Sequence, residues 1–119
     1  MTTLVNISGA RMRFEQDSGS GSLAASYSAT VLTEIESVLL TLASTPTDSE
    51  NFRIFVDDAG GSTKDTTAYL LNLAGGSVPY AAFYPEGLYI KKGDALSLSF
   101  ANTGNIAYVA STIMKEIIA

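Results

Sequence analysis

The chain has 119 residues, of which 46% are hydrophobic and 16% are charged, and its 12 acidic and 7 basic residues give a net charge of −5. This length fits one domain with a single core, and the balance of hydrophobic over charged residues excludes a disordered chain. The seven cations are too few for a surface that follows a nucleic-acid backbone, and an acidic chain gains nothing from an anionic membrane. We therefore expect no nucleic-acid partner and no membrane partner.

Apolar and polar residues alternate along most of the chain, and turn residues interrupt the alternation at short intervals. Near the N-terminus the Gly- and Ser-rich residues 17–22 indicate a loop or a hinge. We interpret residues 1–22 as an N-terminal arm, or as the first strands, with a Gly/Ser hinge. Residues 23–119 are then a β-sandwich domain, and the chain as a whole forms a single domain.

Two segments fit either a helix or a strand. Residues 34–43 place apolar side chains at both helical and alternating positions, and the turn that follows them favours a strand. Residues 111–118 are rich in β-branched side chains, which also favours a strand. With the alternating segments between them, the chain has about eight predicted strands and a turn about every ten residues, a pattern typical of an antiparallel sandwich or a barrel.

Cysteine and histidine are both absent from the sequence. The chain therefore lacks disulfides, the usual general base near neutral pH and the commonest ligands of zinc. Most acidic residues stand beside turn residues, where water solvates them, so we expect no enzyme activity, no cofactor and no metal. The acidic residues between Asp57 and Asp65 could supply oxygen ligands to Ca²⁺, but their spacing does not match a known calcium loop and Lys64 lies among them. An ordinary loop is the favoured interpretation.

Four aromatic residues lie within the ten positions from Tyr80 to Tyr89. Neighbouring side chains of a strand point to opposite faces, so some of these rings are expected to fill the core and others to line a subunit contact, where tyrosine is enriched. The alternative is a platform for sugar rings, although the chain has no tryptophan. The N-terminal segment adds further apolar candidates for a contact. The candidate interface residues are Leu4, Met12, Phe14, Tyr80, Phe83, Tyr84 and Tyr89.

Residues 35–113 resemble the small jelly-roll proteins of tailed-bacteriophage virions. The resemblance lies in the strand Ser-Val-Leu-Leu-Thr-Leu at residues 37–42, the polar turn at residues 45–51 and the hairpin at residues 88–98. In that hairpin Gly93 permits the turn and Asp94 can cap it before the next strand. The resemblance covers about two-thirds of the chain and implies an antiparallel sandwich of the jelly-roll type.

The resemblance also implies a role in the virion. Proteins of this kind decorate the capsid, often as trimers, or serve as head or tail accessory proteins, so we expect a homo-oligomer, with a trimer favoured, that binds the major capsid protein. Such a protein is made in the host cytoplasm and ends on the capsid surface. Residues 1–16 could add a strand to a neighbouring subunit or form the first strand of their own sandwich. A carbohydrate- or receptor-binding module of a tail or fibre is the alternative function.

Overall fold

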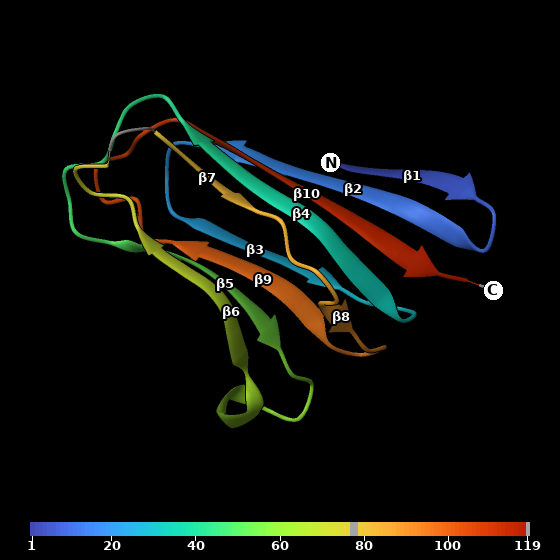
Figure 1. Ribbon diagram of the computed structural model, residues 1–119. Coiled ribbons are helices and arrows are strands. Elements are labelled where there is room, and N and C mark those ends of the chain that lie inside the picture. Colours follow the sequence, from blue (N-terminus) through green and yellow to red (C-terminus); the bar gives the residue numbers. More distant parts are fainter. Residues whose placement is uncertain (77–78, 119) are drawn as a thin grey trace.

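The computed structural model describes residues 1–76 and 79–118, and this part of the chain contains ten strands in two antiparallel sheets. Figure 1 shows the two sheets stacked one above the other. The all-β antiparallel fold predicted from the sequence is confirmed, whereas the described residues form ten strands and not about eight. The difference arises because the N-terminal segment forms two complete strands, β1 and β2.

Sheet A is the larger sheet, with the strand order β1-β2-β10-β4-β7. Strand β7 pairs with the C-terminal half of β4, and β8 pairs with the N-terminal end of β4. Sheet B has the order β3-β9-β5-β6, and a short 3-10 helix, η1 (Ser62–Lys64), precedes β6. The strands of sheet A are β1 (Thr2–Ile7), β2 (Ala10–Gly19), β4 (Thr33–Leu42), β7 (Tyr80–Phe83), β8 (Tyr89–Ile90) and β10 (Tyr108–Ile117). Those of sheet B are β3 (Leu23–Ser28), β5 (Asn51–Asp57), β6 (Thr66–Asn72) and β9 (Ala95–Phe100).

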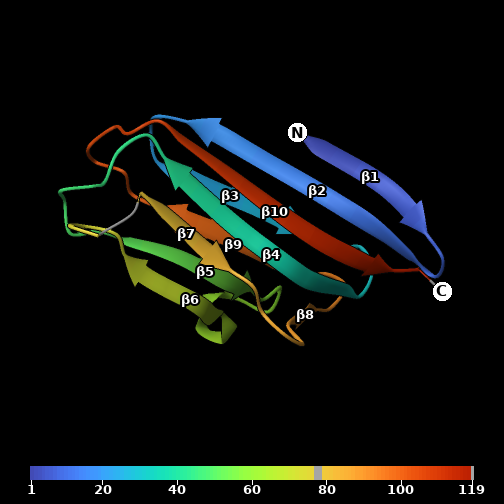
Figure 2. The same ribbon diagram turned by 45° about the horizontal axis from the view of Figure 1, so that its top comes forward.

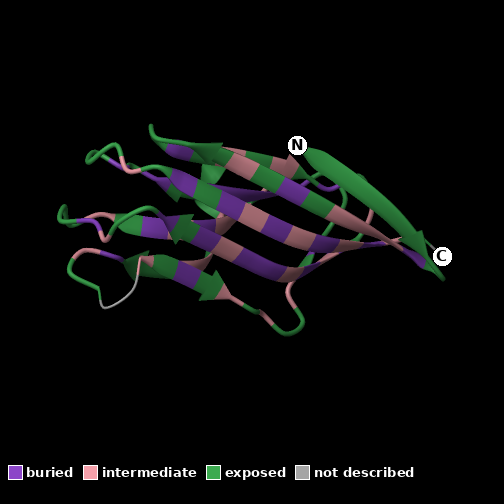
Figure 3. Ribbon diagram, turned by 90° about the horizontal axis from the view of Figure 1, so that it is seen from above, coloured by how far each residue is buried: buried purple, intermediate pink, exposed green. Residues whose placement is uncertain are grey.

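The core lies between the sheets and is built from alternate residues of each strand. Strands β5 and β9 contribute Phe52, Ile54 and Leu98, and β4 contributes Val38 and Leu40, all of them buried. The same alternation leaves the intervening side chains on the outer faces, as the banded colouring of the strands in Figure 3 shows. The two segments of ambiguous pattern are both strands, β4 and β10, and they pair with each other along most of their length at the centre of sheet A.

The N-terminal segment differs from the prediction in one respect. Residues 17–19 were expected in a loop or hinge but belong to β2, because they pair with β10 up to the partners Gly19 and Tyr108. This pairing satisfies the backbone groups of a stretch whose composition alone favours a turn. Only residues 20–22 connect β2 to β3. Within this chain, residues 1–22 thus form the first two strands of sheet A and the connection that follows them.

Candidate interaction surface

The outer face of sheet A carries a row of exposed apolar side chains across neighbouring strands. On β1, β2 and β10 the register places Val5 opposite Met12 and Phe14 opposite Ile113, so these side chains share the face that points away from the core. In Figure 2 no other segment of the described chain crosses over this face. The apolar residues on the outer face of sheet A are Val5, Ile7, Met12, Phe14, Leu39, Tyr80, Val109, Ile113 and Ile117.

The exposure of this face is substantial. Val5 and Ile7 are 47% and 48% exposed and Phe14 is 37% exposed, whereas apolar residues that face the core, such as Phe52, are fully buried. A shallow depression of about 250 Å³ lies between β1, β2 and β10, lined in part by Thr3, Phe14 and Ile113. Contiguous exposed apolar surface of this kind marks a site of interaction, because a soluble monomer gains nothing from keeping it in water.

An acidic pair borders the apolar part of this face. Glu34 and Glu36 are two residues apart on β4 and face outward, and Lys115 on β10 is paired in register with Glu34. Burial and then the neighbouring Glu34 raise the pKa of Glu36, while Lys115 acts in the opposite direction. Glu34 and, secondarily, burial also raise the pKa of Tyr89. Glu36 is one of the acidic residues that do not stand beside a turn, because it lies within β4 next to a like charge.

The predicted interface residues fall into separate groups. Met12 and Phe14 lie on the outer face of sheet A, whereas Leu4 points to the opposite face of β1, beside Arg13. Tyr80, Tyr84 and Tyr89 are 53%, 68% and 50% exposed. They lie on or next to β7 and β8, so the strand order places β10 and β4 between them and the β1–β2 hairpin. The structure thus brings together Met12 and Phe14, whereas Tyr80 and Tyr89 lie beside opposite ends of β4, opposite Thr41 and Glu34.

Phe83, another predicted interface residue, does not lie on the outer face of sheet A. Its ring packs against the core, with its centroid 5.1 Å from that of Tyr69. The physical reason is the two-residue period of a strand, which turns Phe83 inward together with the buried Ala81 and turns Tyr80 outward.

A group of charged residues faces the interior and was missed from the sequence. Arg11, Arg13 and Glu15 alternate along β2 on the side that faces the core, and Glu116 lies beside them on β10. The Arg11 Nε lies 2.6 Å from Glu116 Oε1, and Glu15 and Glu116 are both buried. The Arg13 Nη1 donates to the backbone oxygen of Ser28 at 2.7 Å, which links this group to the end of β3 in sheet B. The partners are far apart in sequence, so only the alternation of Arg13 and Glu15 with Met12 and Phe14 could have signalled them.

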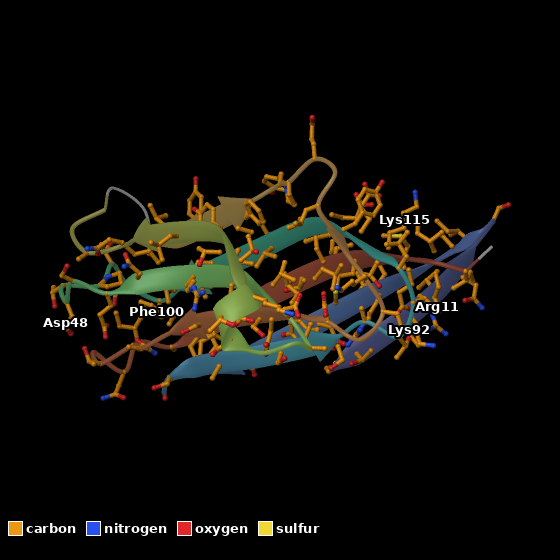
Figure 4. The ribbon with its side chains drawn as sticks, turned by 90° about the horizontal axis from the view of Figure 1, so that it is seen from below. Arg11, Asp48, Lys92, Phe100 and Lys115 are labelled. Carbon is orange, nitrogen blue, oxygen red and sulfur yellow. The ribbon has the colours of Figure 1, made fainter. Side chains whose placement is uncertain are left out.

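The acidic residues near η1 are engaged with the protein itself. The Asp58 and Asp65 carboxylates accept backbone N–H groups of Gly60 and Asp58, and the buried Asp94 accepts that of Ala59 at 3.0 Å. Within the described residues, no three acidic side chains are grouped so as to hold a metal ion. In Figure 4 the side chains of Arg11, Lys92 and Lys115 lie towards one end of the sandwich and that of Asp48 lies at the other.

The described part of the chain contains no helix of the length and apolarity needed to cross a membrane. Comparisons of the chain with the known protein families, with curated proteins and with solved structures find no match.

Proposed function

We propose that this chain is a structural protein of a tailed-bacteriophage virion. In this role it decorates the capsid as a homo-oligomer, binds the major capsid protein through the outer face of sheet A, and stabilises the head by bridging neighbouring subunits. The observation that carries the proposal is the apolar outer face of sheet A, where Val5, Ile7 and Phe14 remain well exposed. The face has an apolar centre, and the acidic pair Glu34 and Glu36 lies at its border. Protein–protein interfaces have the same arrangement of an apolar centre and a polar rim.

The fold proposed with this role is a jelly roll, and the strand order supports it. If β1 is set aside and β7 and β8 are counted as one interrupted strand, eight strands remain. In chain order, the first then pairs with the eighth, the second with the seventh, the third with the sixth and the fourth with the fifth. Eight strands in two sheets with this nested pairing form the double Greek key of jelly rolls, an architecture frequent in viral capsid domains.

The surface relief also favours a broad contact over a small ligand. Three depressions on the described surface measure about 250–270 Å³ each and are shallow. Pockets for drug-sized ligands are concave and span roughly 300–1,000 Å³. The apolar area of sheet A is instead spread over neighbouring strands, as a protein partner requires.

The test is binding to capsids assembled from the major capsid protein of the same genome. We expect the wild-type protein to sediment with capsids, and the double substitution Phe14→Gln and Ile113→Thr to weaken binding at least tenfold, because it removes two apolar neighbours at the centre of the face. The control is Leu70→Gln, which changes an exposed apolar residue of sheet B. Failure of the wild type to bind, or equal binding by the double variant, would contradict the proposal.

The second candidate is a carbohydrate- or receptor-binding module of a tail or fibre. The observation that favours it is the exposure of Tyr80, Tyr84 and Tyr89 along the β7–β8 edge, because exposed rings can stack on sugars. If the protein has this function, it should bind at least one glycan on a glycan array, and the Tyr84→Ala variant should lose that binding. An array without a ligand, or a Tyr84→Ala variant that binds as the wild type does, speaks against it.

A further inference from the structure

Strand β1 forms an open edge of sheet A, and all six of its residues are exposed. Figure 3 shows the whole strand in the colour of exposed residues, beside the banded strands of the core. The exposure applies to both faces, because Leu4 on one face and Val5 on the other are each close to half exposed. An edge strand without cover on either face is a template for pairing with another strand.

The backbone groups on this open edge can be assigned from the hairpin. Met1 and Gln16 exchange two hydrogen bonds, at 3.0 and 3.1 Å, and therefore form a hydrogen-bonded pair. Such pairs alternate with non-bonded ones along an antiparallel ladder. In the β1–β2 register, Thr3, Val5 and Ile7 are therefore the residues of β1 whose backbone groups bond to β2. The N–H and C=O groups of the other three residues, Thr2, Leu4 and Asn6, point away from β2 to the open edge.

The other edges of the two sheets are less suited to pairing. At the far side of sheet A, β7 has four residues between Pro79 and Pro85, and β8 has two. In sheet B, an irregularity in the register of β6 and β5 occurs at Phe55, and β3 exposes only small side chains. Strand β1 contains no charged residue, no proline and no glycine, and its pairing with β2 is regular. The devices that usually protect an edge are therefore absent from β1.

We propose that a second copy of this chain adds its own β1 antiparallel to β1, with Leu4 opposite Leu4 of the partner. This register places Thr2 opposite Asn6 of the second copy. It is the register in which Thr2, Leu4 and Asn6, whose backbone groups point to the open edge, all pair with residues of the second copy whose backbone groups do the same. Six backbone hydrogen bonds form, and none of the open groups is left over. The contact is two-fold symmetric, since each strand presents the same residues to the other.

This dimer is a specific form of the proposed homo-oligomer, and its role in the virion rests on the proposed function. Joining two copies at β1 makes one continuous sheet from both copies of sheet A, so that the outer faces form a surface twice as wide. It also replaces the expected trimer with a dimer, because a two-fold contact closes at two copies. A single pair of short strands is small beside a standard interface of about 1,200–2,000 Å², so the dimer is expected to be reversible and is best examined at high protein concentration.

The experiment is oxidative cross-linking of single-cysteine variants of the full chain, without capsids. The protein has no cysteine of its own, so each variant reports one position. In the proposed register the two Leu4 Cα atoms lie about 5.5 Å apart, within the range of a disulfide, whereas the two Val5 residues are diagonal neighbours at about 7–8 Å. Under mild oxidation we expect Leu4→Cys to give dimers at least tenfold faster than Val5→Cys or the exposed control Tyr84→Cys.

A mass measurement at high concentration supplies the second readout. Leu4→Pro removes the N–H group that points to the open edge but none that bonds to β2, so it should fold and remain a monomer. Leu4→Ala, which retains this N–H group, should still dimerise. Equal cross-linking at the three positions, a monomeric or trimeric wild type, or dimers of Leu4→Pro would overturn the proposal. Because no capsid is present, these results are independent of whether the outer face of sheet A binds one.

Discussion

Arg13 and Glu15 lie two residues apart on β2 and both face the interior of the sandwich, where the Arg13 Nε lies 2.7 Å from Glu15 Oε2. Their side chains are 15% and 5% exposed, so the pair is largely removed from water. Removal of two charges from water costs free energy that their attraction offsets only when further hydrogen bonds satisfy them. Here Thr2 donates to Glu15 and the backbone oxygen of Ser28 accepts from Arg13. These bonds link β1, β2 and the end of β3.

Substitution of Glu116 by glutamine should destabilise the protein. Glu116 is 3% exposed at its side chain and lies within 4 Å of both Arg11 and Arg13, so its neutralisation leaves two guanidinium groups short of a buried counter-charge. We expect a loss of about 2–4 kcal/mol in the free energy of unfolding, measured by urea denaturation. The matched control is Glu86→Gln, in an exposed turn, with a change within about 0.5 kcal/mol. A Glu116→Gln variant as stable as this control would show that the buried ion pairs contribute no net stability.

Tyr27 predicts how stability depends on alkaline pH. Burial first, and then the charges of Asp17 and Glu15, raise the pKa of Tyr27 to about 12 from an ordinary value of 10.0. The folded state therefore holds the phenol proton more tightly than the unfolded state does. Stability from this group is complete below pH 10 and falls as pH rises from 10 towards 12.

The measurement is a series of urea denaturation curves from pH 8 to pH 11.5 for the wild type and Tyr27→Phe. The variant should lose less stability above pH 10 than the wild type. At pH 7 it should be as stable as the wild type or more stable by up to about 1 kcal/mol, because the Tyr27 hydroxyl is buried without a hydrogen-bond partner in the protein. Parallel alkaline decline in both proteins would show that Tyr27 does not govern this pH range.

Asn102 combines an unusual backbone conformation with buried hydrogen bonds, and two substitutions separate these effects. The residue has φ 51°, is 2% exposed, and its side chain bonds the backbone of Gly21 and Ile106. Both substitutions remove the side-chain bonds, but Asn102→Ala keeps a Cβ in the left-handed region, whereas Asn102→Gly removes it and adopts this conformation without strain. We expect thermal denaturation to show both variants destabilised, with alanine worse than glycine by about 1 kcal/mol. Equal losses would assign the whole effect to the hydrogen bonds.

Much of the sandwich follows from local pattern, and the reason is visible in β9. Leu96, Leu98 and Phe100 alternate with small polar residues, and all three are buried, because a strand covered on one face has no other way to bury them. The strands β4 and β10 were also predicted correctly, β4 from the turn that follows it and β10 from its β-branched residues, which favour extended backbone. These elements needed no knowledge of their partners.

The orientation of β2 could not be predicted in this way. Alternation shows that Met12 and Phe14 share one face and Arg13 and Glu15 the other, but it does not show which face is inside. That choice depends on Glu116, which is 105 residues from Arg11 along the chain and meets it only through the β2–β10 register. Residues 17–19 likewise have a local preference for turns, and their pairing with β10 overrides it. The orientation of β2, with its charged residues inside and its apolar residues outside, is therefore set by tertiary contacts. The candidate surface exists only because β2 has this orientation.

Hydrogen exchange along β1 tests both the hairpin and the proposed dimer. In the monomer the amides of Val5 and Ile7 bond to β2, whereas those of Leu4 and Asn6 point to the open edge. At low concentration we expect NMR-detected exchange to alternate, with Val5 and Ile7 protected at least tenfold more than Leu4 and Asn6. At high concentration the Leu4 and Asn6 amides should become protected as the second β1 adds, while Val5 changes little. Val5→Pro supplies the control for the hairpin, because it removes an N–H group that bonds to β2 and should abolish protection along β1 at any concentration. Protection of Leu4 that does not rise with concentration would leave the hairpin intact and exclude the strand-to-strand dimer.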